Sequence, residues 1–185
     1  MWRSACHSFV TQFCVDAAEQ RSLNGCISVK AIPDVYDSLI PSLTVRDAAK
    51  AIEFYRDVFG ATELMRMTMP GSSKIAHAEI KIRDHVLMLH DENPQMGVLS
   101  PQSDGKMSPC AVMIYVADVD ATYNQALSKG AKAFMPVTDM FWGDRFGKFI
   151  DPFGHFWAVA THTREVSPEE CEKAMAEWAK QPPAA

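Results

Sequence analysis

Residues 44–61 read TVRDAAKAIEFYRDVFGA, and this stretch decides the fold of the chain. Over residues 48–59 the apolar side chains recur at the three- and four-residue spacing of a helix, and Asp47 stands before them as a capping residue. Gly60 predicts the end of this helix, because glycine readily adopts the left-handed conformation of a C-cap. Residues 39–45 have the composition of a strand, so the stretch predicts a strand followed by a helix.

Three more strands are expected directly after this helix. Residues 62–68, 75–82 and 85–90 are strand-like, and they are separated by turn residues at Pro70-Gly71 and Arg83-Asp84. The first half of the chain therefore predicts one βαβββ unit.

The same unit is expected a second time after a linker rich in proline and glycine. Residues 43–48, LTVRDA, resemble residues 114–119, IYVADV, and Asp118 can cap a second helix that runs to about Lys129. Further strands are expected around Ala133 and at 146–150 and 155–160, with a turn at 151–154. This internal duplication predicts an α+β fold with tandem βαβββ modules.

The expected domain boundaries follow from this pattern. Residues 1–34 are an N-terminal extension, helical over its middle, and residues 35–163 form the duplicated domain. Within that domain module one spans 36–92, the linker 93–109 and module two 110–163. Residues 164–185 form a C-terminal helix and tail, because Ser167 and Pro168 are a typical helix start and Cys171, Met175 and Trp178 would share one helix face.

Composition excludes several classes of function. The 185-residue chain has a formal net charge of −5 and no basic run, which argues against nucleic acid and anionic membranes as partners. It contains no apolar stretch long enough to span a membrane. Its five cysteines are odd in number and lack CxxC spacing, so neither a disulfide framework nor a structural zinc site is expected. A cytoplasmic protein is the expectation.

The duplicated unit resembles the vicinal-oxygen-chelate superfamily, which contains glyoxalase I, bleomycin-resistance proteins, fosfomycin-resistance proteins and extradiol dioxygenases. The resemblance rests on residues 44–61 and on residues 151–162, DPFGHFWAVATH. The stretches HAEI (77–80), SPQS (100–103) and WGDRFG (142–147) are similar to the PhnB-like subgroup. The resemblance implies that the two mixed sheets curl around a cleft for a small molecule, and that the protein is a homodimer.

The resemblance also implies four metal-ligand positions, one on the first and one on the last strand of each module. In this sequence they fall at Ile40, Met88, Ala111 and Ala158. Apart from the weak thioether of Met88, none of these side chains can donate to zinc, nickel or iron. No metal and no other cofactor is therefore expected, with a divalent metal held elsewhere as the alternative.

Polar residues on the predicted cleft face offer the remaining chemistry. If Arg83-Asp84 is a two-residue hairpin turn, His77, Glu79 and His90 share a sheet face with Met88. Three interpretations of His77, Glu79 and His90 remain open. They could be a displaced metal site, an acid–base pair with Glu79 and His77 as catalytic groups, or ordinary polar residues of a solvent-exposed sheet face.

The loop before and within the second hairpin supplies a second group of candidates for ligand binding. Trp142 offers a surface for stacking and Arg145 a forked donor for an anionic group, although Arg145 could equally pair with Asp144 or Asp139. Phe156 is expected in the cleft wall and His162 at its rim. Met113 shares their face, and core packing is its expected role.

The sequence thus predicts a binding protein that sequesters an apolar or aromatic small molecule without a metal. The alternative is a glyoxalase-like lyase or isomerase that uses a displaced metal site or Glu79 as general base. Whether the protein is an enzyme is left open by the sequence.

Overall fold

The structure is a computed structural model that describes residues 30–34, 36 and 39–180. The chain divides into two units, Met1–Val35 and Tyr36–Ala185. The helix expected in the middle of the first 34 residues lies outside the described residues. The fold and the candidate site belong to the second unit.

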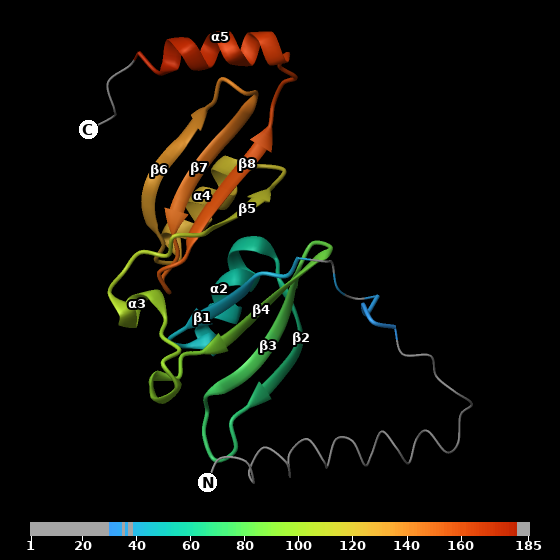
Figure 1. Ribbon diagram of the computed structural model, residues 1–185, viewed down its shortest axis with the longest axis vertical. Coiled ribbons are helices and arrows are strands. Elements are labelled where there is room, and N and C mark those ends of the chain that lie inside the picture. The colour runs from blue at the N-terminus through green and yellow to red at the C-terminus, as the bar shows by residue number, and fades with distance from the viewer. Residues whose placement is uncertain (1–29, 35, 37–38, 181–185) are drawn as a thin grey trace. The chain divides into compact units, whose positions relative to one another are not determined.

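Module one forms a four-stranded mixed sheet with one helix on one face (Figure 1). The strand order is β1-β4-β3-β2, with β1 parallel to β4 and the other neighbours antiparallel. Its elements are β1 (Ser42–Val45), α2 (Ala48–Phe59), β2 (Thr62–Thr68), β3 (Ile75–Ile82) and β4 (His85–Asp91).

Module two repeats this arrangement, with strand order β5-β8-β7-β6 and β5 parallel to β8. Its elements are β5 (Ala111–Tyr115), α4 (Val119–Ser128), β6 (Lys132–Asp139), β7 (Asp144–Ile150) and β8 (Phe156–His162). The C-terminal helix α5 (Pro168–Trp178) follows. The predicted α+β class, with two mixed sheets and a C-terminal helix, is confirmed, and neither sheet closes into a barrel.

The helix caps form where the sequence places them. The side chain of Asp47 accepts a hydrogen bond from the amide of Lys50 at 3.1 Å, and Asp118 accepts one from Ala121 at 2.9 Å. Gly60 ends α2 with a left-handed φ of 67°. α4 ends differently, because its C-cap is Lys129 with an ordinary negative φ.

Two regions depart from the predicted elements. The linker contains a 3-10 turn, η1 (Pro94–Met96), and a short helix, α3 (Pro101–Asp104), where only irregular chain was expected. Ser100 makes α3 possible because its side chain caps the amide of Ser103, and a proline at the first helical position needs no amide hydrogen. Strand β6 is eight residues long despite Pro136, because it lies at the edge of its sheet.

One apolar core joins the helix-facing sides of both modules. Trp157, Tyr55 and Phe149 are its largest fully buried side chains, and the ring centroids of Tyr55 in α2 and Trp157 in β8 lie 5.2 Å apart. Each sheet therefore packs one face against this shared core. We call the opposite sheet face of each module its open face.

A buried carboxylate ties the two modules together. Asp151, in the turn between β7 and β8, accepts hydrogen bonds from the amides of Phe153 and His155, both at 2.9 Å. It also accepts bonds from the hydroxyl of Tyr55 at 2.6 Å and the indole of Trp157 at 2.9 Å. Because Tyr55 belongs to module one, the carboxylate orders its own turn and fixes α2 against module two.

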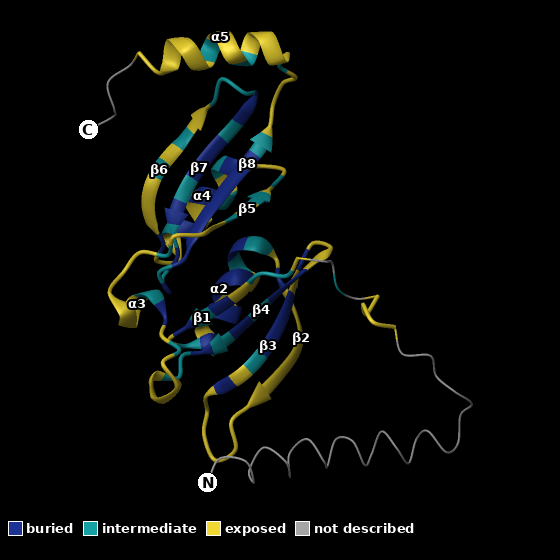
Figure 2. Cartoon of the chain, viewed as in Figure 1, coloured by how far each residue is buried: buried dark blue, intermediate teal, exposed yellow. Residues whose placement is uncertain are grey.

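Helix α5 begins as predicted, because the side chain of Ser167 caps the amide of Glu170 at 3.2 Å. Figure 2 shows that no residue of α5 is buried. Trp178 of α5 contacts the aromatic ring of Phe141, and the two ring centroids lie 6.2 Å apart. Among the described residues, no helix has the length and hydropathy that crossing a membrane requires.

The Tyr55–Asp151 bond can be tested against a second buried tyrosine. Tyr55→Phe removes a hydrogen bond to a buried carboxylate and should lower the free energy of unfolding by about 2 kcal/mol. Tyr123 is the matched control, because its buried hydroxyl has no hydrogen-bond partner among the described residues. Tyr123→Phe should leave stability unchanged or slightly increased. Urea unfolding of both variants measures this, and equal midpoints would contradict the role of Asp151.

Candidate ligand-binding site

The open face of module one has the register that the two-residue turn predicts. Ile82 pairs with His85 and Glu79 with Met88 across β3 and β4. Arg83 in the turn adopts a left-handed φ of 55°. Ile80 and Leu87, which alternate with these residues, are buried in the core. Glu79, Met88, His77 and His90 therefore lie on the open face.

Glu79 is a buried carboxylate at the centre of a small hydrogen-bond network. Its Oε1 atom accepts a bond from the hydroxyl of Tyr36 at 2.7 Å and lies 3.1 Å from Nε2 of His77. The Tyr36 bond is the largest influence on the pKa of Glu79 and lowers it. Burial raises this pKa and the His77 bond lowers it, so that the net pKa lies below its ordinary value.

The protonation state of Glu79 bears on the acid–base alternative. A carboxylate whose pKa is depressed is ionised at neutral pH and is a weaker base than an ordinary glutamate. This geometry suits an acceptor that holds a ligand better than a group that removes a proton.

His90 shares the open face but is held apart from Glu79. Its Nε2 atom lies 3.2 Å from Oγ1 of Thr44, and its Nδ1 atom lies 3.0 Å from the carbonyl oxygen of Asp91. The structure thus brings together His77 and Glu79 but leaves His90 in a different network.

Module two has its own buried carboxylate on the open face. Asp144, at the start of β7, is 3% exposed. Its Oδ1 atom lies 2.8 Å from Nδ1 of His162, and its Oδ2 atom accepts bonds from Tyr115 at 2.8 Å and Trp142 at 3.0 Å. Two of the predicted ligand-binding residues, Trp142 and His162, are therefore joined through an aspartate.

The hydrogen bonds of this cluster decide its charges. Burial alone raises the pKa of Asp144, but the bonds from His162, Tyr115 and Trp142 together outweigh burial and lower it. The pKa of His162 is raised, first by the bond to Asp144 and also by Glu165, whose Oε1 atom lies 3.4 Å from Nε2. The cluster therefore favours an imidazolium beside an ionised carboxylate.

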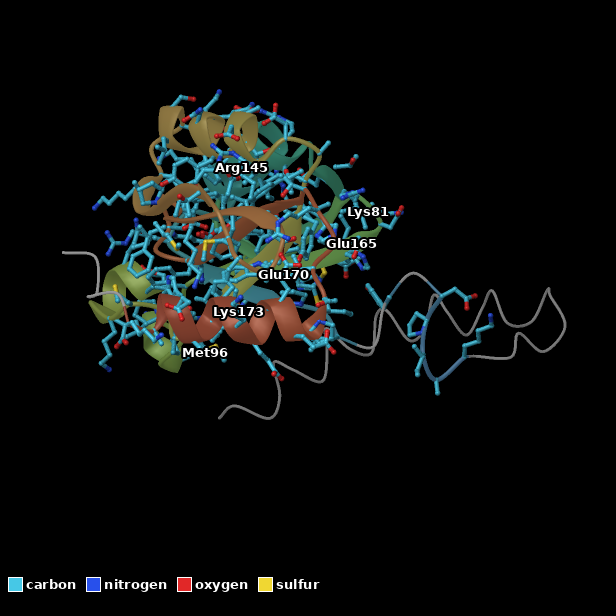
Figure 3. All side chains as sticks on the ribbon, turned by 90° about the horizontal axis from the view of Figure 1, so that it is seen from above. Lys81, Met96, Arg145, Glu165, Glu170 and Lys173 are labelled. Carbon is cyan, nitrogen blue, oxygen red and sulfur yellow. The ribbon has the colours of Figure 1, made fainter. Side chains whose placement is uncertain are left out.

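The interpretation of Arg145 as a ligand-binding group receives no support from its position. Its guanidinium bonds both oxygens of Asp120 in α4, at 2.6 and 2.7 Å, and also Asp139 at 3.1 Å. The Asp139 pair was one expected alternative, whereas the Asp144 pair was wrong, because adjacent residues of a strand point to opposite faces. Arg145 lies on the α4 side of its sheet (Figure 3), away from the open face.

Aromatic and apolar side chains surround these polar groups. Phe156 is buried and meets Phe134 edge to face, with centroids 4.8 Å apart. Phe146, Ala158 and Ala160 form a small apolar cluster on the open face of module two, against which Met135, Met140 and Trp142 pack. Met113, for which core packing was expected, is instead 48% exposed on this face.

The four positions where the resemblance implies metal ligands do not fit a metal. Ile40, Ala111 and Ala158 have no donor atom, and Met88 has only a thioether. Among the described residues, no three His, Cys, Asp or Glu side chains converge as a metal-binding group. We therefore derive no chemical step through a metal.

A cavity of about 500 Å³ lies beside β5, between the β3–β4 turn and module two. Apolar side chains such as Leu87, Val112 and Trp157 line most of it, and neither Glu79 nor Asp144 contributes to it. Met113 and Tyr115 of the open face of module two also line the cavity. We place the candidate site on the open faces, because the buried carboxylates Glu79 and Asp144 lie there.

Sequence reasoning missed Tyr36, Tyr115 and the role of Asp144. Tyr36 and Glu79 are 43 residues apart, and Tyr115 and Asp144 are 29 apart, so no local pattern links them. The sequence did contain a signal for Asp144. Asp144 and Phe146 are two residues apart in one strand, so their side chains point to the same sheet face.

The Asp144–His162 pair predicts a measurable titration. The pKa of His162 should exceed its ordinary value of about 6.5, and Asp144→Asn should lower it, whereas Glu165→Gln should change it less because Glu165 is almost fully exposed. The charged His162 of this pair stabilises the fold. This contribution to stability is complete below the unfolded pKa of His162 and is lost as pH rises through the raised folded pKa. Histidine NMR titrations of the three proteins test this, and equal His162 pKa values in all three would refute it.

Comparison with known proteins agrees with the fold. Residues 37–159 match the Glyoxalase/Bleomycin resistance protein/Dioxygenase superfamily. An uncharacterised protein of Mycobacterium bovis is 41% identical over 145 residues, which are 77% of this chain and 94% of the relative.

Two solved structures share the fold. The protein PA1353 of Pseudomonas aeruginosa superposes with a TM-score of 0.58 at 23% identity, covering 68% of this chain and 98% of its own. The PhnB protein of Bacillus cereus gives a TM-score of 0.54 at 14% identity, covering 68% and 99%. Because the family model matches residues 37–159, more than half of the chain, the chain belongs to the glyoxalase/bleomycin resistance protein/dioxygenase superfamily.

Proposed function

We propose that this protein binds an apolar or aromatic small molecule against its open faces and sequesters it without a metal. The observation that carries the proposal is the set of exposed methionines on those faces. Met65, Met67 and Met113 are 37%, 42% and 48% exposed, and strand pairing places the first two beside Glu79 and His77. Flexible, polarisable methionines are typical of surfaces that adapt to apolar ligands.

Each open face would also supply a polar anchor. Glu79 in module one and Asp144 in module two are buried carboxylates whose pKa values lie below the ordinary range. Tyr36 and Tyr115, which bond them, can turn their hydroxyls toward a bound molecule. Ligand orientation would therefore come from these groups, and affinity from the apolar surface around them.

We also propose that the cleft is formed by two copies of the chain. The helix-facing sides of both modules share one core, so the open face of each sheet points away from that core. A cleft with two walls then needs the open face of a second copy. A homodimer in the cytoplasm, where Cys110 and Cys171 would stay reduced, is the proposed state.

Binding can be measured with Nile red, a neutral aromatic dye. We expect binding that survives treatment with EDTA, and Met113→Glu should weaken it by about tenfold, because a charge replaces apolar contact surface. Met96→Glu is the matched control, since Met96 is 59% exposed in η1 and lies off both faces. Loss of binding on chelation, with stoichiometric nickel, zinc or iron seen by native mass spectrometry, would overturn the metal-free proposal.

The oligomeric state is checked separately by sedimentation equilibrium at several concentrations. The expected mass is that of two 20.6 kDa chains. Met67→Glu should shift the equilibrium toward the monomer, because it places a charge in an apolar contact, whereas Met96→Glu should not. A monomer at all concentrations would contradict the two-copy cleft without touching the binding of Nile red.

A further inference from the structure

The cavity beside β5 is bounded by apolar side chains from both modules. Its volume of about 500 Å³ lies within the range of roughly 300–1,000 Å³ that is typical of small-molecule pockets. The apolar residues that line it include Ile82, Leu87, Val112, Ile114 and Trp157. Because Glu79 and Asp144 do not line it, the cavity is separate from the hydrogen-bond networks of the open faces.

Strand β5 leaves its core-facing side chains incompletely buried. Val112 pairs with Trp157 and Ile114 pairs with Val159 of the neighbouring strand β8, and those two partners are 1% and 0% exposed. Val112 and Ile114 pack against the same core but are only half-buried, because their outer sides face the cavity. An apolar molecule in this space would gain the dispersion contacts that these side chains lack.

The duplication shows that this gap belongs to one repeat only. The capping residues Asp47 and Asp118 correspond, and counting back from them along the strands makes Leu43 of β1 equivalent to Ile114 of β5. Leu43 is buried, whereas Ile114 is half-buried beside the cavity. The first strand of module two is therefore packed less completely than its counterpart in module one.

Arg83, in the turn between β3 and β4, lines the cavity with an exposed side chain. Its Nη1 atom donates a hydrogen bond to the carbonyl oxygen of Tyr115 at the end of β5, at 2.9 Å. The Nε and Nη2 atoms have no acceptor within the described part of the chain. This edge of a guanidinium matches the two oxygens of a carboxylate, so Arg83 offers a forked donor beside an apolar space.

The backbone of Arg83 gives a second reason to assign it a role. Its φ of 55° lies in the left-handed region, where every other described residue with a positive φ is a glycine. A long side chain is disfavoured in this conformation, and strain of this kind is found mostly at functional sites. The bond to Tyr115 uses only one nitrogen of the guanidinium, so bracing of β5 leaves the forked edge unexplained.

We propose that the cavity binds an amphipathic carboxylic acid, with its apolar chain among the apolar side chains and its carboxylate on Nε and Nη2 of Arg83. Asp84 also lines the cavity and would attract a cation instead, so the charge of the ligand is the decisive property. This site is distinct from the open faces, and the inference does not rest on the function proposed for them.

Isothermal titration calorimetry with three ten-carbon probes tests the charge preference. Decanoate should bind saturably, decanol about fivefold more weakly, and decylammonium more weakly still. Arg83→Gln should weaken decanoate binding about fivefold and leave decanol binding unchanged. Arg56→Gln, the same change at an exposed position of α2, is the control and should alter neither. Equal affinity for the three probes, or a preference for decylammonium, would overturn the proposal.

Filling the cavity tests the location. Val112→Phe should abolish saturable decanoate binding, because the larger ring occupies the space of the apolar chain. Val98→Phe is the control, since Val98 is likewise half-buried but lies in the linker, and it should bind decanoate as wild type. Retained decanoate binding by a folded Val112→Phe would overturn the site. Nile red binding should be unchanged in Val112→Phe, because Val112 points away from the open face, so the two sites are tested separately.

Methyl NMR of the wild-type protein decides the location even if Val112→Phe does not fold. Decanoate should shift the methyl signals of Leu87, Val112 and Ile114, which line the cavity. The methyl signal of Met67, on the open face of module one, should stay in place. Shifts confined to methionines of the open faces would overturn the cavity as the binding site.

Discussion

The carboxylate of Asp151 accepts four hydrogen bonds, two from amides of its own turn and two from the side chains of Tyr55 and Trp157. A buried charge is tolerated only when its acceptor capacity is used, so this turn and the α2 helix of the other module must keep their relative positions. The shared core then fills around Tyr55 and Trp157. The orientation of both sheets follows from this contact, because each sheet packs its helix-facing side on the same core.

The open faces are the consequence of that orientation. The shared core covers the helix-facing side of each sheet. The open faces carry exposed methionines together with buried carboxylates. Glu79 and Asp144 are not at equivalent positions of the repeat, because matching the helix caps Asp47 and Asp118 makes Glu79 equivalent to Lys148. The halves of the duplicated chain have therefore become chemically different while keeping one fold. In the proposed cleft, two unlike walls would orient an asymmetric ligand, which two identical walls would not do.

Local patterns in the sequence predicted most of the fold. The caps Asp47 and Gly60, the turn at Arg83-Asp84 and the resulting Glu79–Met88 register all depend on residues close together in the chain. The site was predicted only in part, because its bonds join distant residues such as Tyr36 and Glu79. Arg145 shows the limit most clearly. Its residue type is that of an anion-binding group, but strand parity turns it toward Asp120 in α4.

The methionines of the open faces give the protein a sensitivity that its core does not share. Met65, Met67 and Met113 are accessible thioethers, whereas the core of the modules is built from aromatic and aliphatic side chains. Oxidants convert an accessible thioether to a sulfoxide, which is polar and is reduced again by methionine sulfoxide reductases. Peroxide would therefore make the open faces more polar while leaving the core intact, and the surface would regain its apolar character on repair.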